Sequence, residues 1–226
     1  MPARDVARYR VATMRPEDHD VPSPIDLRDP ADATRWVAAA DVTRPWRAEM
    51  RTAIAELLRG AALRPLRVLE LGPGPGLLAE AIVASCAVAS YTLFDFSAPM
   101  LEMCKQRLGG HPAVRYVLGD FTRDDWTAAL SPPFDAIVTM QAVHEVRHKR
   151  RVPRLYAQAR ALLGPGGMLA VCDHTPPDDS ARYRALHSTV LEQHAALAAA
   201  GFADLVTHLE LHGLYLCSGT RPAADG

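Results

Sequence analysis

The chain has 226 residues, of which 49% are hydrophobic and 23% are charged, and its formal net charge is −1. This size and composition are typical of one globular domain with at most a small extension, which excludes a disordered chain and a small disulfide-stapled scaffold. A net charge close to zero excludes a general electrostatic attraction to nucleic acid or to anionic lipid.

The N-terminal quarter of the chain differs in composition from the rest. Residues 1–30 contain five prolines among many charged residues, so we expect an arm that holds no long helix. Residues 31–60 then show helical spacing, with a short helix that carries Trp36 and a second helix over residues 48–58. We expect residues 1–63 to form an arm and a helical cap.

From residue 64 onward, short apolar runs alternate with helical stretches. The expected strands are residues 67–71, 91–94, 114–118, 136–140 and 168–172, and the helices between them are residues 77–88, 98–108 and 152–163. This alternation is typical of a parallel sheet that is covered on both faces. A long helix over residues 180–200 precedes two strands, 204–211 and 214–218, whose two-residue connection predicts an antiparallel hairpin. We therefore predict an α/β fold over residues 64–220, a Rossmann-like, doubly wound sheet of seven strands.

A glycine-rich turn follows the first expected strand. In an open α/β sheet ligands bind at the carboxyl ends of the strands, and Gly72, Gly74 and Gly76 let the backbone turn tightly there and approach a ligand. Their spacing is G-x-G-x-G and not the G-x-G-x-x-G of a dinucleotide-binding fold. Glu70, two residues before the first glycine, disfavours a pyrophosphate and suits an ammonium group.

Two more carboxylates stand at expected strand ends. Asp95 closes the second strand, where it is placed to accept hydrogen bonds from both ribose hydroxyls, and Asp120 with Phe121 follows the third, where the pair suits an adenine amine. Each acid has a simpler alternative, as a helix N-cap or a solvated loop residue. Three strand-end carboxylates without a lysine or arginine for phosphate favour a nucleoside with a cationic tail.

In these motifs the chain resembles the class I S-adenosylmethionine-dependent methyltransferases. The matching segments are residues 70–76, 94–100, 119–121, 134–138 and 163–167, and with the final hairpin the resemblance covers about residues 64–220. It implies that the cofactor is S-adenosyl-L-methionine. It further implies that the methionine moiety is held by Glu70 and the three glycines, the ribose by Asp95, and the adenine by Asp120 and Phe121. Phe96 and Met100 would flank the base, and Gln141 and Ala142 would line the far side of the cofactor.

His144 is the candidate catalytic residue. Methyl transfer is an in-line displacement that needs alignment of the two reacting atoms, and a base helps where the acceptor must lose a proton. His144 follows the fourth strand, lies near the methyl group by the resemblance, and titrates in the useful range. It is expected to be a base or an acceptor-positioning group, with a packing role as the alternative. His174, after the fifth strand, is a second candidate.

A possible metal-binding pattern and a run of basic residues surround His144. Residues 144–148 match the H-E-x-x-H pattern of zinc proteases, but they open a loop after a strand and no third ligand is signalled, so we expect no metal site. The basic run Arg147-His148-Lys149-Arg150-Arg151 with Arg154 suits RNA phosphates, or else forms the solvated first turns of a helix, which we favour.

We therefore expect methyl transfer to a small-molecule acceptor, at an O, N or C atom. Residues of the cap and of the 180–200 helix are expected on the acceptor side: Trp36, Arg44, Trp46, Arg47, Tyr183, His187 and His194. The alternatives are an RNA or protein methyltransferase and a non-catalytic S-adenosylmethionine-binding protein. Four isolated cysteines, no apolar leader and no spanning segment in the sequence predict a cytoplasmic protein without a membrane partner, and leave its oligomeric state open.

Overall fold

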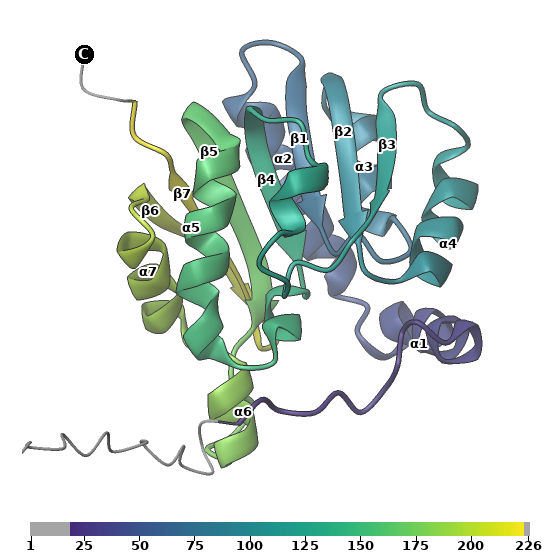
Figure 1. Cartoon of the computed structure of the whole chain (residues 1–226), viewed down its shortest axis with the longest axis vertical. Coiled ribbons are helices and arrows are strands. Elements are labelled where there is room, and N and C mark those ends of the chain that lie inside the picture. Colours follow the sequence, from purple (N-terminus) through teal and green to yellow (C-terminus); the bar gives the residue numbers. More distant parts are fainter. Residues whose placement is uncertain (1–18, 224–226) are drawn as a thin grey trace, which may run out of the picture.

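The fold is built on one seven-stranded sheet with the strand order β3-β2-β1-β4-β5-β7-β6 (Figure 1). The strands are β1 Leu66–Leu71, β2 Val88–Asp95, β3 Val114–Leu118, β4 Phe134–Met140, β5 Leu163–His174, β6 Ala203–Leu211 and β7 Leu214–Thr220. Strands β1 to β5 are parallel, and β7 runs antiparallel to both β5 and β6. The predicted doubly wound sheet with a C-terminal hairpin is confirmed. The computed structural model describes residues 19–223, so most of the predicted arm, residues 1–18, lies outside the described residues.

Helices connect the strands and precede the sheet. They are α1 Pro30–Thr43, α2 Arg47–Ala61, α3 Leu77–Ser85, α4 Ala98–Leu108, α5 Val152–Leu162, α6 Ala181–Leu186 and α7 Val190–Ala199, with short 3₁₀ turns η2 Trp126–Ala129, η3 Val143–Val146 and η4 Lys149–Arg151. The single helix predicted over residues 180–200 is wrong. It is two helices, because His187 is extended and Thr189 begins α7 with a capping box to Glu192.

The sheet separates two apolar cores, because successive side chains of a strand point to opposite faces. Leu93 and Val138 pack with residues of α2 and α3 on one face, while Phe94 and Ile137 pack with residues of α5 and α7 on the other. Each of the four cysteines, all within the described part of the chain, is buried and free. No helix between residues 19 and 223 is long and apolar enough to cross a bilayer.

The N-terminal segment before α1 runs along the edge of the sheet where the parallel strands end (Figure 1). Its backbone is tied to this edge at two points. Val21 donates its backbone N–H to the carbonyl of Arg147, and the Leu27 carbonyl accepts a hydrogen bond from the Ser97 hydroxyl. The segment therefore forms a wall over the carboxyl ends of the strands.

A buried hydrogen-bonded group joins α5, α7 and β7, and it gives a test of the packing. The hydroxyls of Tyr156 and Tyr215 both donate to Oε1 of Gln193, at 3.0 and 3.1 Å, and Gln193 is fully buried. Gln193→Ala leaves these hydroxyls without their acceptor, so the free energy of unfolding should fall by about 2–4 kcal/mol in urea titrations. The matched control is Leu191→Ala, at an 80% exposed position of the same helix, which should shift it by less than about 0.5 kcal/mol. Equal stability of the two variants would contradict this packing.

Candidate functional site

A cavity of about 130 Å³ lies at the carboxyl ends of β1, β2 and β4, where the strand order reverses. It brings together most of the site residues predicted from the sequence: Gly72, Gly74, Asp95, Phe96, Met100, Phe121, Gln141, Ala142 and His144. The other residues that line it are Ile25, Leu27, Trp36, Arg44, Arg47, Pro73, Pro75, Met140, Glu145 and His174. The N-terminal segment, the helical cap and the sheet thus share one cavity.

Glu70 and Gly76 are not among the lining residues. The Glu70 side chain is 1% exposed and accepts a hydrogen bond of 2.6 Å from the Tyr91 hydroxyl. Burial raises the pKa of Glu70 to about 8, against the opposing effect of the Tyr91 hydrogen bond. The Glu70 carboxyl is therefore turned towards Tyr91 behind the cavity wall, and its role in holding the methionine moiety stays a prediction. Gly76 packs on α4, where an added Cβ would lie 2.5 Å from the Cys104 sulfur.

Positions 72 and 74 of the turn are glycine for different structural reasons. Gly72 has a φ of +69°, and an added Cβ would lie 2.4 Å from the Cβ of Ala142. Gly74 has a φ of +54°, and among the described residues no atom lies within 4 Å of the position of its missing Cβ. Gly72 is therefore required by packing, whereas Gly74 presents bare backbone to the cavity, as a glycine that cradles a ligand does.

Asp95 joins the glycine turn to the end of β2. It is 4% exposed, and its two carboxylate oxygens accept hydrogen bonds from the backbone N–H groups of Gly74, at 3.0 Å, and Ser97, at 2.9 Å. Burial raises the pKa of Asp95 to about 6, with these backbone hydrogen bonds opposing the shift. A further backbone hydrogen bond comes from Phe96, so backbone donors fix the carboxylate in place at the cavity wall. A carboxylate has about four lone-pair sites, so it can accept more bonds than these three.

Asp120 lies in the wall of an adjoining cavity of about 570 Å³. Arg28 lies 3.0 Å from its carboxylate and stacks over the Phe96 ring, 4.6 Å from the ring centroid. Ile25, Leu27, Phe96 and Phe121 line both cavities. The inner cavity alone is smaller than the roughly 300–1,000 Å³ of a typical ligand site, and the two adjoining cavities together provide that room.

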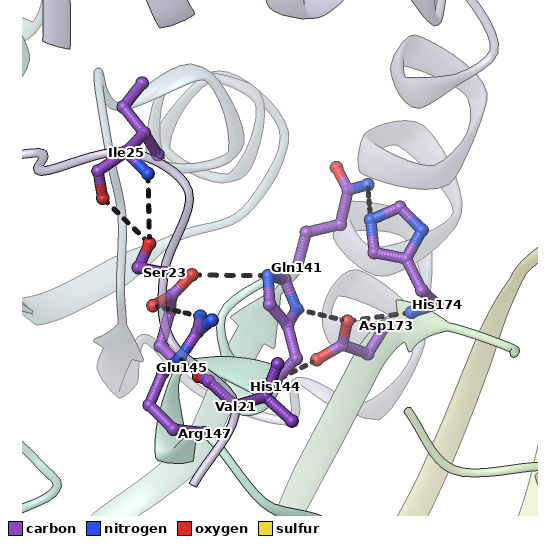
Figure 2. Close-up of polar contacts among 9 residues, drawn as sticks. All are labelled: Val21, Ser23, Ile25, Gln141, His144, Glu145, Arg147, Asp173 and His174. Carbon is purple, nitrogen blue, oxygen red and sulfur yellow. Dashed lines mark hydrogen bonds and ion pairs between the residues drawn. The ribbon is translucent and has the colours of Figure 1, made fainter. Parts of the chain in front are cut away.

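His144 is held between two carboxylates (Figure 2). Its Nδ1 lies 2.8 Å from Oδ1 of Asp173, its backbone N–H donates to Oδ2 of the same residue, and its Nε2 lies 3.4 Å from Glu145. Burial works against the charged ring, but Asp173 and Glu145 prevail and raise the pKa of His144 to about 10. Burial likewise opposes the charge on Asp173, whose pKa the His144 cation holds well below its usual range. An oriented imidazolium results.

Two more histidines surround this pair. The ring centroids of His144, His174 and His187 lie 5.3–5.6 Å apart. The pKa values of His174 and His187 are both lowered to about 4, and burial is the largest cause of each shift. His174 Nε2 lies 2.8 Å from the side-chain nitrogen of Gln141, a non-glycine residue with a φ of +56°. Such left-handed strain costs about 1–3 kcal/mol and is concentrated at functional sites.

The H-E-x-x-H pattern does not form a helical metal site. It lies across the two 3₁₀ turns η3 and η4, with Arg147 in a left-handed conformation between them, whereas the zinc motif needs both histidines on one helix. Ligand atoms of His144, Asp173 and His187 do lie within 4.8 Å of one another, without His148. The absence of a metal stays a prediction.

Three residues of this site were missed by the sequence analysis. Asp173 is the last residue but one of β5, and Asp95 is the last residue of β2, so the position of Asp173 near a strand end was an available signal. Glu145 was considered only as part of the zinc pattern. Arg28 lies 92 positions before Asp120, and no local pattern marks that contact.

The acceptor-side residues separate in the structure. Trp36, Arg44 and Arg47 line the cavity, and Tyr183 stacks on His187 with ring centroids 5.8 Å apart. Trp46 and His194 lie outside this cavity. Trp46 packs against His212, and His194 forms a hydrogen bond with the Thr207 hydroxyl of β6.

The geometry of Asp95 predicts its importance for a nucleoside ligand. Asp95→Asn removes the charged acceptor, so affinity for S-adenosylhomocysteine, the demethylated cofactor, should fall about 10- to 100-fold in calorimetric titration. Asp125→Asn, at a 73% exposed side chain, is the matched control and should bind as the wild type does. An unchanged dissociation constant for Asp95→Asn would contradict the assignment.

Comparisons with known proteins agree with this arrangement. Residues 68–167 match a family described as a methyltransferase domain. The trans-aconitate 2-methyltransferase of Delftia acidovorans is 35% identical over 143 residues, 61% of this chain and 47% of that protein. The malonyl-[acyl-carrier protein] O-methyltransferase of Halalkalibacterium halodurans is 30% identical over 114 residues, 50% of this chain and 41% of that protein. The chain thus spans less than half the length of these two curated relatives.

Solved structures show the same fold. A DhpI–SAH complex superimposes with a TM-score of 0.66 over 87% of this chain and 94% of that one, at 22% sequence identity. Over residues 68–167 the chain is thus similar to methyltransferases, and its described residues share the fold of the DhpI–SAH complex.

Proposed function

We propose that this protein transfers a methyl group from S-adenosylmethionine to a small-molecule acceptor, with residues 64–220 as the transferring domain and residues 1–63 as its cap. One observation carries this proposal: a single cavity is lined by the glycine turn, Asp95 and the His144 ring that Asp173 orients. The two curated relatives reported above are named for trans-aconitate and for malonyl-[acyl-carrier protein]. Trans-aconitate is a tricarboxylate, and a malonyl group carries one free carboxylate. We therefore favour an acidic acceptor.

The cofactor is proposed to lie across the two adjoining cavities. Gly72 and Gly74 would meet the methionine part and Asp95 the ribose hydroxyls, because these groups line the inner cavity. The adenine would lie among Phe96, Met100 and Phe121, with Asp120 at its edge, and Gln141 with Ala142 would line the opposite side. S-adenosylmethionine supplies a methyl group on a positively charged sulfur, ready for attack by a nucleophile.

We propose the neutral form of His144 as the base that takes a proton from a hydroxyl or ammonium group of the acceptor, and Asp173 as its positioning residue. Asp173 contacts both the ring and the backbone of His144, so it fixes the ring orientation and leaves Nε2 on the side of Glu145. Both His144 and Glu145 line the inner cavity, so a proton that the ring takes up at Nε2 stays beside the Glu145 carboxylate.

The RNA-binding alternative is disfavoured by the pairing of the basic run. Lys149 lies 2.6 Å from Glu192, Arg151 2.7 Å from Asp20, and Arg154 2.6 Å from Asp124. Because these carboxylates neutralise them, the side chains do not form the free positive surface that phosphates need.

The His144→Ala variant distinguishes a methyltransferase from a protein that only binds S-adenosylmethionine. His144→Ala should lower the rate of radiolabelled methyl transfer to the hydroxyl groups of a panel of small hydroxy acids and phenols by about 10²- to 10⁴-fold, because the base that takes the hydroxyl proton is lost. S-adenosylhomocysteine affinity should change by less than about 3-fold, since hydrogen bonds of the glycine turn and Asp95 remain. His194→Ala, whose partner is Thr207 outside the cavity, is the matched control with wild-type turnover. Undiminished turnover of His144→Ala would sink the assignment.

The pH dependence tests the same pair from another side. With the pKa of His144 raised to about 10, the free base is scarce at pH 7, so kcat/KM should increase as the pH rises from 7 towards 10. Asp173→Asn removes the charge that stabilises the imidazolium, which should move this rise towards about pH 6.5, the ordinary histidine value. Turnover at the plateau should fall as well, because the ring is no longer oriented. Identical pH profiles for the two proteins would show that His144 is not the titrating base.

A further inference from the structure

Arg47 of α2 is a buried cation in the wall of the inner cavity. The residue is only 6% exposed. Its Nε and Nη1 atoms are buried, and within residues 19–223 neither makes a hydrogen bond. A guanidinium has five N–H donors and no acceptor, so an arginine placed in this way retains donors that no described group of the protein uses.

The nearby carboxylate does not satisfy Arg47. Asp41 lies 3.3 Å from its Nη1 without hydrogen-bond geometry. The same carboxylate accepts two hydrogen bonds from Arg51, of 3.2 and 2.7 Å, one on each oxygen. One negative charge is therefore shared by two guanidinium groups, and the cluster keeps a net positive charge.

Among residues 19–223, the other groups described beside Arg47 include an aromatic ring and further cations. The Trp36 ring lies 5.2 Å from the guanidinium carbon and covers one of its faces. Arg44 lines the same cavity and adds a second positive charge. Burial is the largest influence on Arg47 and lowers its pKa, and Arg51 and Arg44 act in the same direction. An arginine nevertheless stays protonated in proteins, so the positive charge persists.

A buried positive charge of this kind lowers the stability of the folded protein unless a ligand pairs with it. The open side of Arg47 is the cavity, which it shares with the glycine turn, Gln141 and His174. A carboxylate is the group that best matches a guanidinium in charge and in hydrogen-bonding geometry.

We propose that Arg47 binds a carboxylate of a ligand in this cavity, with Arg44 as a second cation. This inference rests on the proposed function, because the ligand is one that the methyl-transfer cavity holds. Two ligands there supply this chemistry: the methionine part of the cofactor and an acidic acceptor. The recognition is the same in both, and the source is decided by experiment.

The test uses Arg47→Gln and two nucleosides that differ only in the amino-acid part. S-adenosylhomocysteine has the carboxylate, and 5′-methylthioadenosine lacks it. If the carboxylate is that of the cofactor, Arg47→Gln should weaken S-adenosylhomocysteine at least about 10-fold in calorimetric titration and leave 5′-methylthioadenosine within about 2-fold. If it is that of the acceptor, S-adenosylhomocysteine binding stays unchanged, and succinate binding to the S-adenosylhomocysteine-loaded protein is lost.

The matched control is Arg59→Gln, which removes the same type of side chain from the 62% exposed face of the same helix and should bind all three probes as the wild type does. Thermal unfolding separates a binding role from a structural one. Without ligand, Arg47→Gln should melt no lower than the wild type, because an incompletely paired buried charge has been removed. Should that variant fail to fold, Arg47→Lys keeps the charge but loses the planar fork, and it should show the same selective loss in part.

Two results overturn the inference. Unchanged binding of S-adenosylhomocysteine and of succinate in a folded Arg47 variant overturns it and leaves the proposed function standing. A wild-type protein that binds neither S-adenosylhomocysteine nor 5′-methylthioadenosine overturns the proposed function, and this inference with it.

Discussion

The parallel direction of β1 to β5 is the constraint on which the site depends. Parallel strands deliver their carboxyl ends to one edge of the sheet, and the order β3-β2-β1-β4-β5 reverses beside β1, so that helices leave towards opposite faces and a space opens between them. The glycine turn, Asp95, Gln141 and Asp173 all follow or end these strands. Functional side chains far apart in the sequence thereby meet in one place without any special local motif.

The charges at this edge are fixed before any ligand arrives. Asp95 is held by backbone N–H groups, and Asp173 holds both the ring and the backbone of His144. Groups fixed in this way need little reorganisation when a ligand binds, which is how a buried polar site favours one geometry. The N-terminal segment adds Arg28 to the wall of the outer cavity, and α2 adds Arg47 to the wall of the inner one, so each adjoining cavity has both carboxylates and cations in its lining.

The sheet was predictable because its signals are local: apolar runs of strand length, helical spacing between them and a two-residue hairpin turn. Asp95 was predictable because its position at a strand end fixes where its carboxylate lies. Two features were not predictable, since each depends on a contact between distant residues: Glu70 turns to Tyr91, and Arg28 reaches Asp120 from the N-terminal segment. The helix break at His187 has a local signal, the capping box of Thr189 and Glu192, which the prediction of one helix over residues 180–200 overlooked. A sequence pattern gives strand ends, but not the rotamer at each end.

The most direct test of this account is a crystal structure of the protein with S-adenosylhomocysteine. The account predicts both ribose hydroxyls on the Asp95 carboxylate, the adenine among Phe96, Met100 and Phe121, and the sulfur on the side of the cavity that holds His144. A ligand bound at another place, or an Asp95 carboxylate that contacts only backbone groups, would contradict it.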